Sequence, residues 1–207
     1  MNPSKKKILD KAFTLFLTGS YDSVSMREIQ EATKVSRGAI YHHFKSKEEI
    51  FDNIVNDYLL PIFSSFSLIP EEERNSLQNT IFAFVTHRQN HINQLKDLVP
   101  EKAKMTDFFF LKFIFQATEH SSTFHEKASL QYEKDFLSWR NIVQIAMRTG
   151  EIKPDIDIDY VTQYFVTTPY SIGMSSAFNQ YVHASTTDLR SIYLRFYNLL
   201  KKTAYLP

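Results

Sequence analysis

The chain has 207 residues, of which 43% are hydrophobic, enough to bury a sizeable core as one large or two modest domains. It contains no cysteine, which excludes disulfide bonds and thiolate catalysis. The formal net charge is only +1, so any affinity for nucleic acid must come from the local placement of charge and not from a general excess of lysine and arginine.

The apolar segments of the sequence are too short for a membrane span or a secretion signal. The N-terminal lysines are followed at 8–11 by two apolar and two charged residues, which is too polar and too short for the core of a signal peptide. The longest apolar run, at 108–115, contains Lys112 and falls far short of the roughly 20 residues that cross a bilayer. The sequence therefore predicts a soluble, cytoplasmic protein with no membrane partner.

The first predicted helix lies before Gly19. Its apolar residues recur at helical spacing and are Ile8, Leu9, Ala12, Phe13 and Phe16. We expect Gly19 to end this helix, because glycine suits the left-handed conformation found after many helices.

Two short helices separated by a tight turn are predicted next. Ser25 and Glu28 have the spacing of a capping box, in which each side chain accepts a hydrogen bond from the backbone of the other residue. A helix therefore begins at about Ser25, with Ile29 and Ala32 on its inward face. The polar residues at 33–34 interrupt this helix and form the turn.

The second of these helices is predicted at 37–44, after a capping serine at Ser36. Ile40 and Phe44 stand four residues apart and pack inward, which leaves an outer face that is small, basic and aromatic. Two short helices joined by a tight turn are typical of a helix-turn-helix, a motif that reads DNA.

A further capping box, Ser46 with Glu49, predicts another helix immediately afterwards. Residues 35–50 resemble the recognition helix and the following helix of the TetR family of bacterial transcriptional regulators, and residues 19–25 resemble the segment that precedes them in that family. The resemblance covers about the first quarter of the chain, and the remainder is similar in architecture only. Lys34 stands where family members often carry glycine, and a left-handed turn there costs roughly 1 kcal/mol.

Small and cationic side chains near the start of the second helix suit a reader of the major groove. Arg37 is the predicted base reader, because a guanidinium can bond bidentately to guanine O6 and N7. Arg27, on the supporting helix, is a second candidate for a contact with a base or a phosphate. Gly38 and Ala39 are expected to let the backbone approach the groove closely and to contact base edges.

The resemblance implies phosphate contacts for Tyr41, His43 and Lys47, which would fix the register on the duplex. Ser36 and His42 are further candidates for either kind of contact. Consecutive helix positions point about 100° apart, so the adjacent histidines are not expected to share a metal ion. The alternative interpretation is a helical hairpin whose charges are only solvated.

The rest of the sequence has a helical pattern and no convincing strand. We predict an all-α fold with an N-terminal helix-turn-helix DNA-binding domain at 1–50 and a C-terminal helical effector-binding and dimerisation domain at 51–207. Basic residues outnumber acidic ones in the first domain, and its lysines at 5–7 either lie along phosphates or form a solvated turn. The helices predicted in the second domain lie at 71–94, 106–121, 124–149, 157–181 and 187–203.

The last two predicted helices are assigned to a homodimer interface. The last helix carries a wide apolar stripe, and the small residues at 173–178 permit a close helix approach. Two copies would build an intersubunit four-helix bundle and place two recognition helices about one DNA turn apart on a palindromic operator. The alternative is that both helices pack only within one chain. The stripe consists of Leu189, Ile192, Tyr193, Phe196, Leu199 and Leu200.

The family resemblance also implies an unidentified small-molecule effector that binds among the C-terminal helices. This region is rich in phenylalanine and tyrosine and holds Trp139 beside Arg140, so an apolar or aromatic effector is expected. Arg88, His91 or Arg140 would bind its polar groups. The alternative is that the aromatic residues form only a core. Pro169 is expected to kink its helix where a pocket could open.

No metal, cofactor or catalytic site is predicted. His87 and His91 have the spacing of zinc-binding helices, but Arg88 replaces the glutamate of a zinc protease and no third ligand is evident. A Gly-rich phosphate loop and a nucleophile elbow are absent. The favoured hypothesis is a DNA-binding regulator, a dimeric repressor released from its operator by the effector. The alternative is a helical ligand-binding or interaction protein without operator-specific DNA binding.

Overall fold

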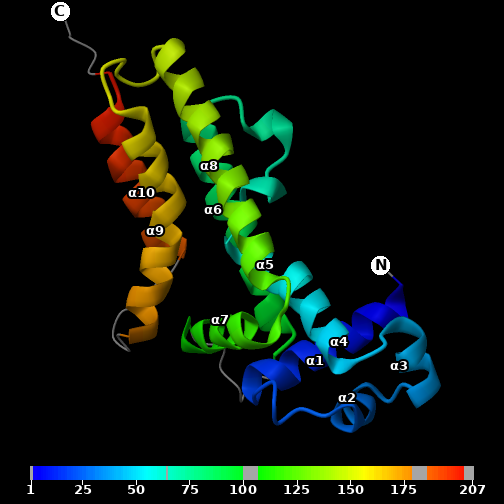
Figure 1. The fold of residues 1–207 in the computed structure, drawn as a ribbon. Coiled ribbons are helices and arrows are strands. Elements are labelled where there is room, and N and C mark those ends of the chain that lie inside the picture. Colours follow the sequence, from blue (N-terminus) through cyan, green and yellow to red (C-terminus); the bar gives the residue numbers. More distant parts are fainter. Residues whose placement is uncertain (1, 64, 100–106, 179–185, 203–207) are drawn as a thin grey trace, which may run out of the picture. The chain divides into compact units, whose positions relative to one another are not determined.

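The structure is a computed structural model that describes residues 2–63, 65–99, 107–178 and 186–202 (Figure 1). Within these ranges every regular element is helical, apart from an isolated bridge between Ile152 and Lys201, which confirms the all-α prediction. The α-helices are α1 (Pro3–Thr18), α2 (Met26–Thr33), α3 (Arg37–His43), α4 (Lys47–Ile54), α5 (Leu60–Phe63), α6 (Leu77–Asp97), α7 (Asp107–His120), α8 (Phe124–Arg148), α9 (Ile158–Phe178) and α10 (Thr186–Leu200).

The chain divides into two compact units. Unit 1 comprises Met1–Leu60 and Ile92–Ala128, and unit 2 comprises Pro61–His91 and Ser129–Pro207. This division differs from the predicted boundary at residue 50, because the chain beyond α4 continues to bury side chains in unit 1. Among the helices described, none combines the length and apolar character that crossing a membrane requires.

The core of unit 1 is aromatic and is built where α1, α4 and α7 meet. The predicted apolar face of α1 is buried. The Phe13 ring lies edge-on to Phe113 of α7, with 5.7 Å between centroids, and the Phe16 ring lies edge-on to Phe51 of α4 at 5.1 Å. Such edge-to-face pairs add to the stabilisation that burial alone provides. Phe113 therefore makes α7 part of the same core as the N-terminal helices.

Gly19 ends α1 in a different way from the one predicted. Its φ is −100°, so the backbone there is not left-handed. A Cβ at this position would lie 3.1 Å from the Leu15 carbonyl oxygen and 3.1 Å from Ser23 Oγ. Glycine is favoured here because the next turn packs closely against the helix end, and not because of a positive φ.

The helix predicted from residue 71 begins later, at Leu77. Glu71–Glu73 form a short 3-10 turn after Pro70 instead. The amides of Leu77 and Gln78 donate to the Glu151 carboxylate, each at 2.9 Å, so an acidic side chain distant in sequence caps the positive end of α6. The predicted ends of the last two helices, at 179–181 and 203, lie outside the described residues.

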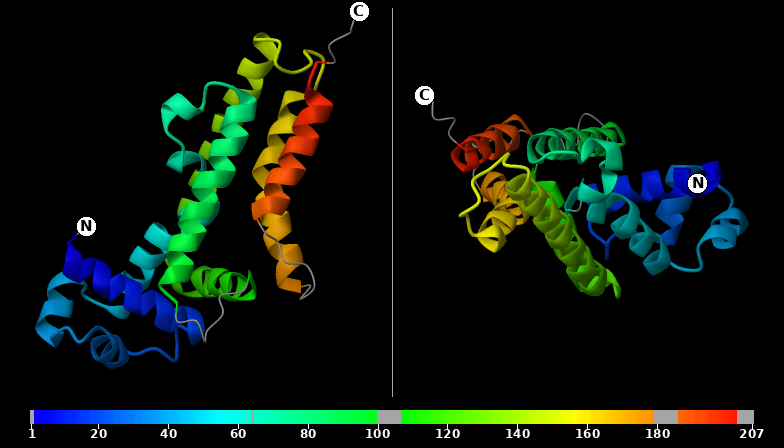
Figure 2. Two further views of the ribbon diagram at one scale, coloured as in Figure 1. Left: turned by 180° about the vertical axis from the view of Figure 1, so that it is seen from behind. Right: turned by 90° about the horizontal axis from the view of Figure 1, so that it is seen from above.

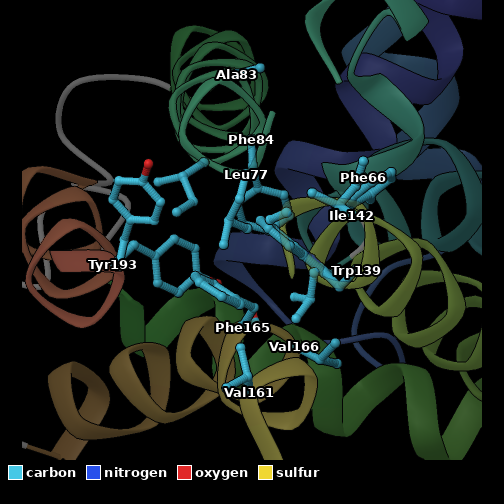
Figure 3. Packing of buried hydrophobic residues seen from close by; sticks show 14 of the residues in the cluster. Phe66, Leu77, Ala83, Phe84, Trp139, Ile142, Val161, Phe165, Val166 and Tyr193 are labelled. Atoms are coloured by element: carbon cyan, nitrogen blue, oxygen red, sulfur yellow. The ribbon is translucent and has the colours of Figure 1, made fainter. Parts of the chain in front are cut away.

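Unit 2 is built from the described parts of α6, α8, α9 and α10 around a cluster of aromatic rings. Trp139 is 1% exposed and stacks on Phe165 with 4.8 Å between centroids and 9° between planes. Phe84 of α6 and Tyr193 of α10 lie edge-on to the same indole (Figure 3). The aromatic residues of the C-terminal region are thus used to join four helices.

The proline within α9 is compensated by a neighbouring helix. α9 and α10 lie side by side in unit 2 (Figure 2). Pro169 has no backbone N–H, so the Phe165 carbonyl lacks the donor that normally stands four residues later. The hydroxyl of Tyr193, from α10, donates to that carbonyl instead. Burial raises the pKa of Tyr193 well above its usual value, which keeps this donor protonated.

Candidate nucleic-acid interface

The start of α2 is held by the predicted capping box. Ser25 Oγ accepts from the amide of Glu28 at 3.2 Å, and Glu28 Oε2 accepts from the amide of Ser25 at 2.7 Å. The Ser25 hydroxyl also donates to Glu28 Oε2 at 2.8 Å, and the two bonds that the carboxylate accepts from Ser25 lower the pKa of Glu28 by stabilising its charged form. Ile29 is buried as predicted, but Ala32 is exposed and Thr33 takes the inward position one turn after Ile29. This correction follows from helical spacing, since four residues bring a side chain closer to the same face than three.

The turn between α2 and α3 has the left-handed conformation expected of it. Lys34 adopts φ 54° and ψ 29°, and its amide donates to the Gln30 carbonyl at 2.9 Å. Thr33 Oγ1 donates to the Gln30 carbonyl at 3.1 Å and accepts from the Val35 amide at 3.3 Å. The buried threonine therefore supports a turn that a non-glycine residue strains by about 1 kcal/mol.

The recognition helix α3 is short and presents most of its side chains to solvent. Ser36 Oγ caps it by accepting from the Ala39 amide at 3.3 Å. Ile40 and Phe44 are buried, whereas Arg37 and Tyr41 are exposed. Their exposure leaves them accessible to a molecule outside the chain.

The remaining predicted contact residues of α3 lie on or beside this exposed face. Gly38 and His42 are exposed, and Ala39 and His43 are half-buried. A Cβ on Gly38 would meet no described atom within 4 Å, so the described packing places no demand for glycine there. The open space beside Gly38 would let another molecule approach the backbone of α3 closely.

A groove of about 370 Å³ lies between α2 and α3. The Arg37 guanidinium lies over the Tyr41 ring, 5.5 Å from its centroid. On the other wall, Arg27 Nε donates to Glu31 Oε1 at 2.8 Å. Sequence reasoning missed Glu31, which the opposite charges at i and i+4 could have indicated. The groove is lined by Met26, Arg27, Gln30, Glu31, Arg37, Ile40 and Tyr41.

Lys47, at the start of α4, binds within the chain. Its ammonium donates to the Tyr21 carbonyl at 3.0 Å and lies 4.1 Å from the centroid of the Tyr21 ring. The capping box predicted before α4 is only half present. Ser46 Oγ accepts from the Glu49 amide at 3.2 Å, but Glu49 Oε2 accepts from the amide of Lys45 at 2.6 Å and not from that of Ser46.

The segment that leads into α2 is fixed by α7. The amide of Tyr21 donates to Gln116 Oε1 at 2.6 Å, and Gln116 Nε2 donates to the Phe16 carbonyl at 3.3 Å. Lys112 donates to the Gly19 carbonyl, and the His120 ring stacks on Tyr21 with 4.2 Å between centroids. These contacts join residues that are far apart in sequence, so no local pattern indicated them.

The residues predicted to bind an effector have different surroundings in the structure. Trp139 is part of the unit 2 core, and Arg140 Nε pairs at the surface with Asp159 Oδ1 at 2.7 Å. Arg88 instead donates through Nε to the Ile62 carbonyl at 3.2 Å, and His91 is half-buried.

The electrostatic grouping of Asp135 with the half-buried Tyr170 and Arg88 in unit 2 was not predicted. Asp135 of α8 is 5% exposed and acts electrostatically on Tyr170 of α9, as does Arg88. The pKa of Tyr170 is raised to about 12, mainly by burial and then by the charge of Asp135, while Arg88 opposes the shift. Among the described residues, no three potential ligands are placed to hold a metal ion. His87 Nε2 lies 3.2 Å from Glu73 Oε2.

The fold and the exposed face of α3 define a helix-turn-helix DNA-binding protein. Residues 8–54 match the model of the bacterial regulatory proteins of the tetR family. Over these residues the chain is similar to the TetR family of transcriptional regulators.

Relatives of known role match most of the chain or a shorter part of it. The HTH-type transcriptional repressor KstR2 of Mycolicibacterium smegmatis is 23% identical over 172 residues, which cover 80% of this chain and 76% of the relative. The negative transcriptional regulator IcaR of Staphylococcus aureus, of the biofilm operon icaADBC, is 30% identical over 84 residues, which cover 39% of this chain and 45% of that protein.

Solved structures share the fold over nearly the full length. A TetR-family regulator from Cytophaga hutchinsonii has a TM-score of 0.67 at 14% identity, with 97% of this chain and 98% of that chain covered. The TetR-family regulator PfmR from Thermus thermophilus has a TM-score of 0.65 at 17% identity, with 92% and 97% covered.

Proposed function

We propose that this protein is a dimeric transcriptional repressor that acts on DNA in the cytoplasm. It would bind a palindromic operator and be released by a small, largely apolar or aromatic effector. The observation that carries the proposal is the exposed, basic and aromatic face of α3 beside the α2–α3 groove. The similarity to proteins named as repressors supports negative regulation. No observation favours a helical interaction protein that lacks operator-specific binding.

In this proposal Arg37 reads a base, and Gly38 and Ala39 allow the helix to enter the major groove. Ser36, Tyr41, His42 and His43 contact phosphates or base edges. Their exposed or half-buried positions support these roles.

Lys47 remains a candidate for a phosphate contact, although its ammonium already serves the chain. An ammonium has three donors, and the Tyr21 carbonyl takes one of them. The contribution of Lys47 to DNA binding is therefore expected to be smaller than that of a fully exposed lysine.

We propose a homodimer through α9 and α10, with part of the predicted stripe facing the partner. Leu189, Tyr193 and Leu200 are buried within the chain, so they support the fold of unit 2. Leu199 is 70% exposed and Met174 of α9 is 42% exposed. Large apolar side chains that stay exposed on adjacent helices suit a subunit interface.

The effector is proposed to bind near Arg88, Asp135 and Tyr170. Asp135 is buried, whereas Arg88 and Tyr170 are half-buried. A buried ionisable group is costly unless it is paired, so such groups often serve a functional site. An aromatic molecule with a carboxylate would pair with the guanidinium of Arg88. Trp139 is the only tryptophan of the chain, so its fluorescence can report binding from a panel of aryl carboxylates.

The test of operator binding is a selection from a pool of random DNA duplexes, followed by titration of the enriched duplex at two salt concentrations. A scrambled duplex measures binding that depends only on phosphate charge. We expect selective binding that persists at the higher salt, and weaker binding with relaxed preference at one base pair in Arg37→Ala. Arg148→Ala, which removes an exposed arginine from the end of α8, is the matched control. A selection that enriches no sequence would overturn the proposal.

A further inference from the structure

One wall of the α2–α3 groove is an ion pair on the surface of α2. Arg27 and Glu31 stand one helical turn apart, with side chains 87% and 62% exposed, and Nε to Oε1 measures 2.8 Å. The opposite wall carries Arg37 and Tyr41. Any duplex that α3 contacts through this groove also meets the ion pair.

The geometry of the pair leaves part of the arginine available. The structure records the hydrogen bond to Glu31 from Nε, so the two terminal amino groups of the guanidinium do not share in that bond. Those two groups form the edge that can donate in parallel to O6 and N7 of guanine. Glu31 thus fixes the side chain of Arg27 while it leaves a base-reading edge exposed.

The charge of the pair argues against a phosphate contact at this point. A carboxylate beside the duplex repels phosphates, and it neutralises the cation next to it. The release of counterions from DNA is the main source of sequence-independent affinity. Because Arg27 is paired with Glu31, its contact with DNA releases few of them. A residue whose role was to hold the phosphate backbone would gain nothing from this neighbour.

We propose that Glu31 is a positioning residue that makes Arg27 a base reader and suppresses phosphate binding by α2. The recognition surface then extends from α3 onto α2 and includes one base pair read by Arg27. This inference rests on the proposed function, because it concerns how the same surface reads an operator.

The experiment compares the full-length protein with Glu31→Gln and Arg27→Ala. Each is titrated against the selected duplex, its single-base variants and a scrambled duplex, over a series of salt concentrations. Glu126→Gln is the matched control, because it removes an exposed carboxylate of unit 1 that lies outside the groove. Thermal unfolding of all variants shows whether the fold is kept.

We expect Glu31→Gln to bind the scrambled duplex a few-fold more tightly and to steepen the salt dependence by up to about one unit of slope, because Arg27 is freed for phosphates. Discrimination at one base pair should fall roughly tenfold. Arg27→Ala should lose discrimination at the same base pair and keep its salt slope. Glu126→Gln should leave the discrimination unchanged.

Two results would overturn the inference while leaving the proposed function intact. One is an Arg27→Ala variant that weakens all duplexes alike and lowers the salt slope by about one, which marks a phosphate contact. The other is a Glu31→Gln variant with unchanged base preference. A wild-type protein that selects no sequence would instead remove the proposed function, and this inference with it.

Discussion

The α2–α3 surface of unit 1 and the aromatic cluster of unit 2 draw on similar residues for opposite purposes. Arg37 and Tyr41 are exposed and in contact with each other, whereas Trp139 and Tyr193 are almost fully buried. Helical spacing shows which side chains share a face, but it does not show whether that face meets solvent or another helix. For the short capped helices of unit 1, local sequence was enough to predict which face meets solvent. For the long helices of unit 2 it was not enough.

The largest expected effect is the loss of a ring from the unit 2 cluster. Trp139→Ala should lower the free energy of unfolding by about 3–5 kcal/mol, because it leaves a cavity among packed rings. Tyr41→Ala, on the exposed face of α3, should change it by less than about 0.5 kcal/mol. Urea unfolding followed by circular dichroism measures both. Similar losses in the two variants would break the contrast between the regions.

The contrast also predicts where DNA affinity resides. Arg37→Ala should weaken binding to the selected duplex by about 1–3 kcal/mol and relax preference at one base pair. Binding titrations with single-base variants of the duplex measure this. Equal losses on the selected and scrambled duplexes would show that Arg37 contacts phosphate instead.

The burial of Tyr170 predicts a pH dependence for unit 2. Its pKa is raised to about 12 in the folded chain, from 10.0, so the unfolded chain releases the proton first. The stabilisation from this group is complete below pH 10.0 and is lost as the pH rises towards about 12. Tyr170→Phe should reduce the alkaline loss of stability in this window by about 2 kcal/mol. An unchanged pH profile in urea unfolding would contradict this burial.

The smallest expected effect concerns the turn before α3. Lys34→Gly should stabilise the fold by about 0.5–1 kcal/mol, because glycine adopts φ 54° without the steric cost of a Cβ. Lys45→Gly, at an exposed lysine without positive φ, should destabilise it and serves as the control. Thermal unfolding distinguishes the two. Destabilisation by both variants would show that the strain is absent.

Local patterns predicted local structure well. The Ser25 and Glu28 capping box and the burial of Ile40 and Phe44 depend on neighbours within one or two turns, and the structure confirms them. The same spacing predicted that the DNA-contact residues of α3 would lie outward or at the margins, and the structure has them exposed or half-buried. The acceptor for the Tyr21 amide lies 95 residues away, and local periodicity carries no information about such a partner. The surroundings of Trp139 are formed by side chains from several helices, so its sequence neighbours could not show whether it lines a pocket or fills a core.

Because α7 fixes the segment before α2, the DNA-binding unit cannot be fused to another protein as its N-terminal residues alone. A cassette that ended at Leu60 would remove Phe113 from beside Phe13 and would leave the buried Tyr21 amide without its acceptor, Gln116. Chimeric regulators that graft this operator-reading head onto another sensor should therefore also carry residues 92–128. Unit 1 is formed by two separate segments of the chain. Its exchange therefore requires the second segment to be excised at both of its ends, in addition to the boundary after Leu60.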